Sequence, residues 1–178
     1  MLPFDEIRQF THEIKKRPRN VEEEDLISTI VGLLILSYKN GIDDANSMID
    51  TDYKRDFEKL MESLNKEYDG KTWEDRVREY YETNDGESIA RVIDTEAHRN
   101  YNQAIIDIAL ESGKDVKKTW KTMLDDKVRD THSYLQGLTV SIDEKFYTYD
   151  GDEALFPGDF KNPANNCGCR CMVILSES

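Results

Sequence analysis

Three cysteines within five positions constrain this chain more than any other feature of its sequence. They lie near its C-terminal end, in the run Asn165-Asn166-Cys167-Gly168-Cys169-Arg170-Cys171. His132 lies upstream and is the only histidine in the C-terminal third of the chain. Three thiolates and one imidazole form a complete donor set for tetrahedral zinc. A fold that uses this set must bring the segment around His132 against the cysteine run.

The sequence leaves the state of these cysteines open between zinc ligands, buried free thiols and a disulfide. An odd number of cysteines argues against a secreted disulfide framework. In an extended strand Cys167 and Cys171 would lie about 13 Å apart, so the segment must bend if all three thiols share one ion with His132. Gly168 permits that bend. If only Cys169 and Cys171 bind with His132, the fourth ligand is one of Asp125, Asp159 and Cys167.

The chain is acidic, with 24 basic and 37 acidic residues and a net charge of −13. Residues 114–178 carry 9 basic and 11 acidic side chains, so most of the excess lies in the first 113 residues. A surface of this sign repels phosphate, and we expect weak or no direct binding to DNA. One basic strip interrupts it and is interpreted as a solvated face in preference to a DNA-binding one: Lys114, Lys117, Lys118 and Lys121.

The longest apolar stretch covers residues 26–36, which is 11 residues. A membrane span needs about 20 residues, so we expect a buried helix here and no membrane partner. The first ten residues contain acids and no apolar run, and no signal peptide is expected there.

Apolar residues recur with helical spacing through the first 113 residues. The spacing predicts helices at residues 4–16, 21–39, 52–68, 73–81 and 88–112. Asn20 is the expected N-cap of the second helix, and Gly41 is expected to bend or end it. Thr72 and Asp75 form the pattern of a capping box.

The pattern changes after Gly113, which is expected to end the last long helix. Strands are predicted at residues 116–122, 138–142, 146–149 and 169–175, with a short helix at residues 125–135. The sequence therefore predicts an α+β fold. A helical arm or bundle at residues 1–113 precedes a small α+β module at residues 114–178 with a short antiparallel sheet.

Several of these residues follow a recognisable order. The pattern W-x-T-x-x-D-x-x-V-R-x-x-H-x-x-L-x-G is formed by Trp120, Thr122, Asp125, Val128, Arg129, His132, Leu135 and Gly137. It is followed by Phe146, Pro157, Asp159 and Cys169-Arg170-Cys171, and preceded by Thr95-Glu96, Arg99 and Asn102. Together they resemble the Mu F-type minor head (head morphogenesis) proteins of tailed bacteriophages, over residues 73–174. Gln136, Cys167 and Gly168 depart from the usual pattern of that family.

The resemblance implies a virion protein present in few copies in the phage head, near the portal. Such proteins act in head assembly and in packaging and ejection of the genome. The expected partners are portal or capsid proteins. The expected location is the head interior or portal vertex, and the host cytoplasm during assembly.

Two groups of polar residues share helical faces and are interpreted as a structural cluster. They are Asp125, Arg129 and His132 on the predicted short helix, and Glu96, Arg99 and Asn102 on the long helix. A non-enzymatic role is favoured, because the chain has no Gly-rich phosphate loop and no Ser/His/Asp order. The alternative is an ADP-ribosyltransferase-like or nuclease-like effector that uses Arg129 and His132. An enzyme requires these groups to line a cleft.

Overall fold

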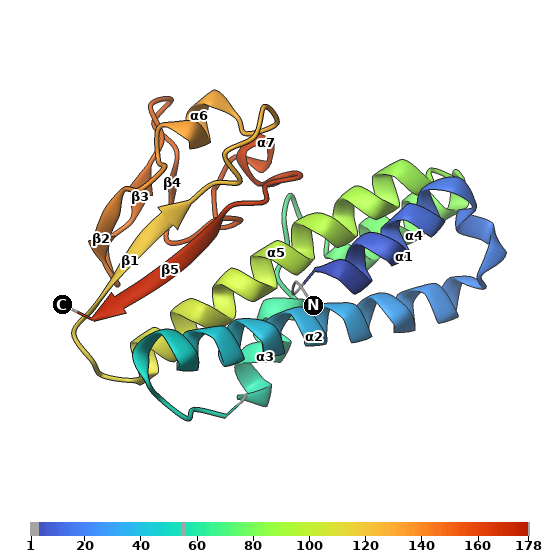
Figure 1. The fold of residues 1–178 in the computed structure, drawn as a ribbon. Helices are drawn as coiled ribbons and strands as arrows, with labels where there is room; N and C mark the ends of the chain where they lie inside the picture. The colour runs from blue at the N-terminus through green and yellow to red at the C-terminus, as the bar shows by residue number, and fades with distance from the viewer. Residues whose placement is uncertain (1–3, 55, 178) are drawn as a thin grey trace.

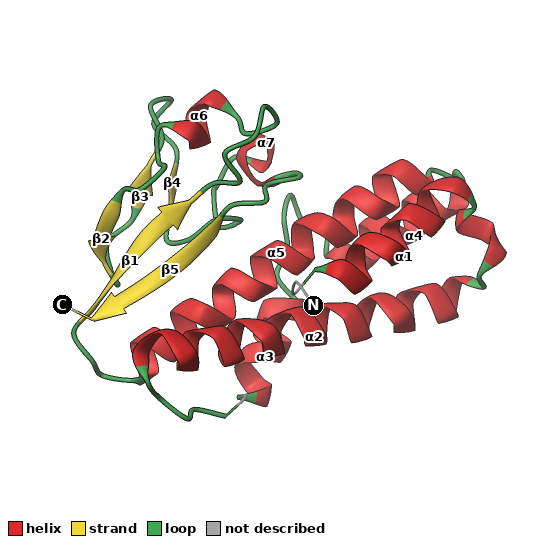
Figure 2. Ribbon diagram, in the orientation of Figure 1, coloured by secondary structure: helices red, strands yellow, loops and turns green. Residues whose placement is uncertain are grey.

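The computed structural model describes residues 4–54 and 56–177. A layer of helices lies along one side of the molecule and a small sheet module lies against it (Figures 1 and 2). The helical part comprises α1 (Asp5–Lys16), the 3-10 turn η1 (Pro18–Asn20), α2 (Glu23–Ile49), α3 (Phe57–Leu64), α4 (Trp73–Glu82) and α5 (Gly86–Glu111). The remainder comprises β1 (Val116–Lys121), α6 (Asp130–Ser133), β2 (Thr139–Ser141), β3 (Phe146–Tyr147), β4 (Glu153–Ala154), α7 (Pro163–Asn166) and β5 (Met172–Glu177). The predicted α+β class is confirmed.

The two longest helices, α2 and α5, pack side by side and form the centre of the helical part (Figure 1). Gly41 was expected to bend or end α2, and it does not end the helix, because α2 continues to Ile49. Gly41 serves a different purpose, at the contact between the two helices. A Cβ atom there would lie 2.3 Å from the carbonyl oxygen of Tyr101 and 2.8 Å from the Cβ of Ala104. The missing side chain lets α2 and α5 approach closely.

Helix α2 is also long and apolar enough, by length and composition alone, to cross a membrane, with a mean hydropathy of 1.2 in its most apolar window. Half of that window is buried inside the fold. Leu26 and Leu34 have no exposed surface, and Ile30 is 1% exposed. These side chains supply the core between α2 and its neighbours, as is typical of a central helix in a globular domain.

The starts of two helices test the capping predictions. The side chain of Thr72 accepts a hydrogen bond from the backbone N–H of Asp75, and the Asp75 carboxylate accepts one from the N–H of Thr72. The predicted capping box is therefore confirmed. The prediction for Asn20 is wrong, because Asn20 closes η1 and Glu22 is the N-cap of α2.

The module contains a three-stranded antiparallel sheet in the order β2-β1-β5 and a separate two-stranded sheet of β3 and β4. In the central strand β1, the buried side chains alternate: Val116, Lys118 and Trp120. Strand β5 pairs with β1 and also packs against α2 and α5. The sheet is thus attached to the helical part through β5 (Figure 1).

All predicted elements of the module are shorter than expected, and two of them have a local explanation. The predicted helix at residues 125–135 is reduced to α6, because Leu124 has a positive φ of 56° and Arg129 is extended, with φ −63° and ψ 149°. The predicted strand at residues 169–175 begins only at Met172. The chain turns at Gly168, whose φ of +67° is easily reached by glycine and rarely by other residues.

Candidate functional site

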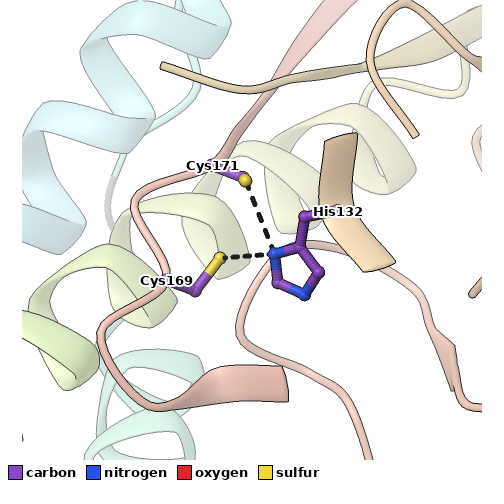
Figure 3. A group of neighbouring side chains, drawn as sticks. All are labelled: His132, Cys169 and Cys171. Carbon is purple, nitrogen blue, oxygen red and sulfur yellow. Dashed lines mark hydrogen bonds between the residues drawn. The ribbon is translucent and has the colours of Figure 1, made fainter. Parts of the chain in front are cut away.

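His132 of α6 and two cysteines of the loop before β5 come together (Figure 3). The Nδ1 atom of His132 lies 3.5 Å from the Sγ of Cys169 and 3.6 Å from the Sγ of Cys171. The three potential ligand atoms all lie within 4.8 Å of one another. His132 is 1% exposed, Cys169 5% and Cys171 3%. We call this group the histidine–cysteine centre.

The chain positions the two sulfur atoms through backbone contacts on either side of Gly168. The N–H of Gly168 donates to the hydroxyl of Thr95 at 2.9 Å, and the N–H of Cys169 donates to the carbonyl of Asn166 at 3.0 Å. The carbonyl of Cys171 accepts from the side-chain amide of Asn102 at 3.1 Å. Because Thr95 and Asn102 both belong to α5, this helix holds the loop that carries the thiols.

Aromatic rings surround the imidazole of His132. The ring of Phe160 stacks on it with centroids 5.2 Å apart, and Trp120 meets it edge-on at 5.6 Å. The Nε2 atom of His132 is buried without a hydrogen-bond partner among the described residues. Nδ1, the nitrogen that faces the two sulfurs, is therefore the ring nitrogen with hydrogen-bond partners.

The pKa values of the two buried thiols are shifted in opposite directions. A hydrogen bond from Cys171 lowers the pKa of Cys169 well below its ordinary value, against the opposing effect of burial and with support from His132. The hydrogen bond to Cys169, together with burial, raises the pKa of Cys171. One thiolate forms readily at Cys169, and a thiolate is the form of cysteine that binds metals.

The spacing of these atoms fits a tetrahedral zinc ion. With Zn–S bonds of about 2.3 Å and Zn–N bonds of about 2.0–2.1 Å, a tetrahedral site separates nitrogen from sulfur by about 3.6 Å. The observed separations are 3.5 and 3.6 Å. The adjacent hollow has a volume of about 10 Å³, roughly the room that one water molecule requires. The donors therefore suit three protein ligands and one small fourth ligand.

None of the three residues considered as a fourth ligand lies in the histidine–cysteine centre. Cys167 is exposed, and its carbonyl oxygen accepts a hydrogen bond from Arg129. The Asp159 carboxylate pairs with Lys66 at 2.6 Å. Asp125 forms two hydrogen bonds of 2.8 Å with Arg170.

Asp125 and Arg129, which were expected to share a helical face, have different partners. The prediction required both residues to lie on one helix, and residues 125–129 are not helical. Arg170 takes the place of Arg129 as the partner of Asp125, and the hydrogen bond from Arg170 lowers the pKa of that carboxyl. The acid, the arginine and the histidine of the predicted short helix therefore have three separate sets of partners.

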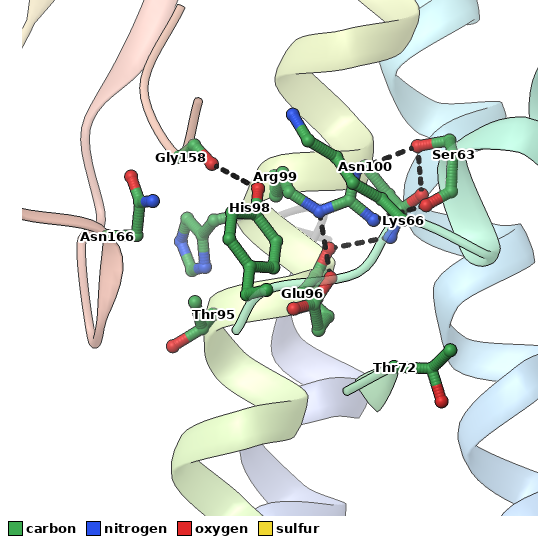
Figure 4. Close-up of polar contacts among 12 residues, drawn as sticks. Ser63, Lys66, Thr72, Thr95, Glu96, His98, Arg99, Asn100, Gly158 and Asn166 are labelled. Atoms are coloured by element: carbon green, nitrogen blue, oxygen red, sulfur yellow. Dashed lines mark hydrogen bonds and ion pairs between the residues drawn. The ribbon is translucent and has the colours of Figure 1, made fainter. Parts of the chain in front are cut away.

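The second predicted group, on α5, is buried, and Figure 4 shows two of its members, Glu96 and Arg99. The carboxylate of Glu96 accepts from Arg99 at 2.8 Å and from Arg76 of α4 at 2.7 Å. Burial opposes ionisation, but the charges of Arg99 and Arg76 hold the pKa of Glu96 below its ordinary value. The guanidinium of Arg99 also donates to the hydroxyl of Ser63 in α3 at 3.1 Å. This charged group joins α5 to α3 and α4.

Asn102 makes the corresponding connection to the module. Its side-chain oxygen accepts from the N–H of Val173 at 2.9 Å, and its amide donates to the carbonyls of Cys171 and Pro157. The three predicted residues of α5 thus make two connections. Glu96 and Arg99 join α5 to other helices, and Asn102 joins it to β5.

Sequence reasoning missed several partners of these groups. Ser63 and Arg76 bind Arg99 and Glu96 from other helices, and no sequence spacing connects them. Asn166 was quoted only as part of the cysteine run, yet its amide bonds both the N–H and the carbonyl of Phe160. Lys118 was interpreted as solvated and is fully buried. Lys118 and Trp120 are two residues apart in a predicted strand, so they lie on the same face, and this spacing was the available signal.

The comparisons with known proteins agree with the resemblance. A family model described as Phage Mu protein F like protein matches residues 57–174. Minor head protein GP7 of Bacillus phage SPP1 is 32% identical over 82 residues, which is 45% of this chain and 27% of that protein. The NAD(+)–arginine ADP-ribosyltransferase EFV of Enterococcus faecalis is 32% identical over 104 residues, 48% of this chain and 21% of that protein.

The chain thus aligns with about a quarter of the length of these two relatives. No solved structure matches the chain. The family match covers more than half of the sequence and includes the histidine, both buried cysteines and Asn102. The chain therefore belongs to the Phage Mu protein F like family.

Proposed function

We propose that this chain is a minor head protein of a tailed bacteriophage, located in the virion. Membership of the family and the similarity to minor head protein GP7 support this function. The main supporting observation is that the motif residues are buried and hold parts of the fold together. His132, Cys169 and Asn102 are at most 5% exposed and serve to fasten β5 and its loop to the rest of the fold.

In this proposal the α+β module at residues 114–178 is a compact docking unit, and residues 1–113 form the helical arm that carries it. The partners are portal or capsid proteins, at the portal vertex or in the head interior. The chain acts in head assembly and in packaging or ejection of the genome, and passes through the host cytoplasm during assembly. The net charge of −13 supports contact with protein in preference to DNA.

The enzymatic alternative also has a relative, since EFV is an ADP-ribosyltransferase, but the alignment covers only 21% of that protein. The geometry around Arg129 and His132 supports it less. The hollow that both residues line has a volume of about 10 Å³, whereas ligand pockets occupy about 300–1,000 Å³. A nicotinamide dinucleotide does not fit there, and the non-enzymatic function is the better supported of the two.

We further propose that the histidine–cysteine centre holds a zinc ion. His132, Cys169 and Cys171 supply the ligands, and Cys167 stays outside. A bound zinc ion would act as a structural cross-link between α6 and the loop before β5, since structural zinc sites contribute directly to folding free energy. The spacing of the donor atoms supports this assignment.

The virion function is tested with phage particles. Heads purified from an infected culture are analysed by quantitative mass spectrometry, and neighbours are identified by chemical cross-linking. We expect a few copies of the chain per head and cross-links to portal or capsid subunits. Absence of the chain from purified heads would contradict the proposal.

The metal assignment is tested separately, so that its failure leaves the virion function standing. Protein purified under reducing conditions is analysed for zinc, and a molar ratio near one is expected. Cys171→Ser should lose the metal, whereas Cys167→Ser, which removes the exposed thiol, should retain it. A metal-free wild-type protein that gains no stability on addition of zinc would exclude the site.

A further inference from the structure

A hollow of about 180 Å³ lies where α4 and α5 meet the loops of the module. It is separate from the histidine–cysteine centre, although exposed Cys167 lies on its rim. The side chains that decide its chemistry are Tyr68, Arg76, Tyr80, Arg91, Val92 and Pro163. We call it the arginine pocket.

The charge of the arginine pocket is opposite to that of the chain as a whole. Three arginines and one carboxylate line it, namely Arg76, Arg91, Arg99 and Glu96. Glu96 is already bound to Arg76 and Arg99. The pocket therefore presents a net positive charge in a protein whose net charge is −13. Such a local reversal of sign attracts an anion.

Arg91 is the cation available to a ligand. Its side chain is exposed, and within residues 4–54 and 56–177 its guanidinium takes part in no hydrogen bond or ion pair. It makes only a minor contribution to the lowered pKa of Asp85, whose main cause is the hydrogen bond from Ser88. By contrast, Arg99 is fully engaged by Glu96 and Ser63.

The walls of the arginine pocket are apolar and fixed in place. The hydroxyl of Tyr68 donates to the carbonyl of Gly158 at 3.0 Å, which ties this ring to the module. The guanidinium carbon of Arg76 lies 6.0 Å from the centre of the same ring, and Arg76 also donates to the carbonyl of Thr72 at 3.2 Å. These contacts within the protein hold the pocket in shape.

We propose that the arginine pocket binds an organic carboxylate, whose apolar body is no larger than about one aromatic ring. Arginine presents two parallel N–H groups that match a carboxylate, and the tyrosine rings, Val92 and Pro163 provide the apolar contact. The volume of about 180 Å³ is close to that of an engineered cavity of about 150 Å³ that binds benzene. A single uncommitted guanidinium matches one negative charge, which favours a carboxylate over a phosphate dianion.

Two kinds of molecule carry such a carboxylate: a small free molecule, and the C-terminus of a partner protein. This inference goes beyond the proposed virion function and does not depend on it. It is also independent of the metal assignment, because the arginine pocket uses none of the proposed zinc ligands.

The experiment titrates the folded full-length protein with three probes of similar size, and binding is followed by calorimetry and by amide shifts in NMR spectra. The probes are benzoate, phenyl phosphate and benzyl alcohol. We expect saturable binding of benzoate that is at least tenfold tighter than binding of either other probe. Equal or tighter binding of phenyl phosphate or benzyl alcohol would overturn the proposal, as would the absence of saturable benzoate binding.

A matched pair of variants tests the role of Arg91. Arg91→Gln should weaken benzoate binding at least tenfold. Arg8→Gln removes the same charge from an exposed residue of α1 that forms an ion pair with Asp5 at 3.8 Å, and should leave binding unchanged. Unchanged binding in Arg91→Gln would overturn the proposal.

Cys167 provides a second readout that needs no variant. Benzoate should slow the alkylation of this exposed thiol by iodoacetamide, because the thiol lies on the rim of the pocket. An unchanged alkylation rate at saturating benzoate would contradict the location. Tighter binding of a short peptide with a free C-terminal phenylalanine than of benzoate would support a protein terminus as the source, and weaker binding would support a small molecule.

Discussion

The side-chain oxygen of Asn102 accepts a hydrogen bond from the backbone N–H of Val173, with 2.9 Å between the two atoms. The amide of the same side chain donates to the carbonyl of Cys171 at 3.1 Å. One residue of α5 therefore satisfies backbone groups on both sides of Met172, where β5 begins. It also fixes the distance between α5 and the loop that carries the buried thiols.

Replacement of Asn102 by alanine should destabilise the protein by about 2–3 kcal/mol, because it leaves buried backbone groups without partners. Urea unfolding followed by tryptophan fluorescence measures the change. Gln103→Ala, on the same helix, removes only a hydrogen bond of 2.8 Å to Asp107 that is partly exposed. It should cost less than 1 kcal/mol. Equal losses in the two variants would contradict the assigned role of Asn102.

The two glycines of α2 should respond to alanine in opposite directions. Gly41→Ala places a Cβ 2.3 Å from the carbonyl oxygen of Tyr101, and overpacking of this kind costs about 1–3 kcal/mol or more. Gly32 has nothing within 4 Å of the added atom, so Gly32→Ala should stabilise the helix by up to about 1 kcal/mol. Thermal unfolding of the two variants gives the signs. A stabilising Gly41→Ala would show that α2 and α5 are further apart than described.

Removal of Arg99 alone from the buried charged group should destabilise the protein more than removal of Glu96 and Arg99 together. Arg99→Leu leaves the carboxylate of Glu96 with Arg76 alone, and both Glu96 and Arg99 are 1% exposed. Loss of one member of a buried pair typically costs about 3–5 kcal/mol. The double variant Glu96→Leu/Arg99→Leu should recover part of that loss, since the charge then left without its partner is Arg76, whose side chain is 22% exposed. Chemical unfolding of the single and double variants tests this order.

Lys118 should make the stability depend on pH in the alkaline range. Burial lowers the pKa of this lysine to about 8, although Asp143, Asp159 and Glu144 favour its charged form. In the unfolded chain the pKa is about 10.4. Between these values the unfolded state binds more protons, so the free energy of unfolding should rise with pH, by at most about 1.4 kcal/mol per unit.

The variant Lys118→Met isolates this effect, because the other titrating groups cancel in the comparison with the wild type. We expect the difference in unfolding free energy between the two proteins to change between pH 8 and pH 10, in favour of the wild type. It should stay constant below pH 7, where the ammonium is charged in both states. A flat difference across the alkaline range would contradict the lowered pKa.

The helices and the central strand were predictable because their signals are local. The capping box of Thr72 and Asp75, the apolar stripe of α5 and the alternation in β1 each lie within a short segment. Gly41 shows where local reasoning fails. A glycine within a helix is usually unfavourable, and its benefit here comes from Tyr101 on another helix.

The candidate site was predictable in its donors and less so in its geometry. His132, Cys169 and Cys171 come together as their residue types suggested. The exclusion of Cys167 depends on the turn at Gly168, where either an extended or a bent chain was compatible with the sequence. The pairing of Asp125 with Arg170 joins segments far apart in the chain, so no helical spacing could indicate it.

Strand β1 is paired along its whole length by β5, from Val116 with Glu177 to Lys121 with Met172. During synthesis, residue 177 must therefore leave the ribosomal exit tunnel before β5 can pair fully with β1. Until then Trp120, which is fully buried in the folded protein, lacks its pairing partner Val173. The three-stranded sheet is therefore completed only after every other strand of the module has been made.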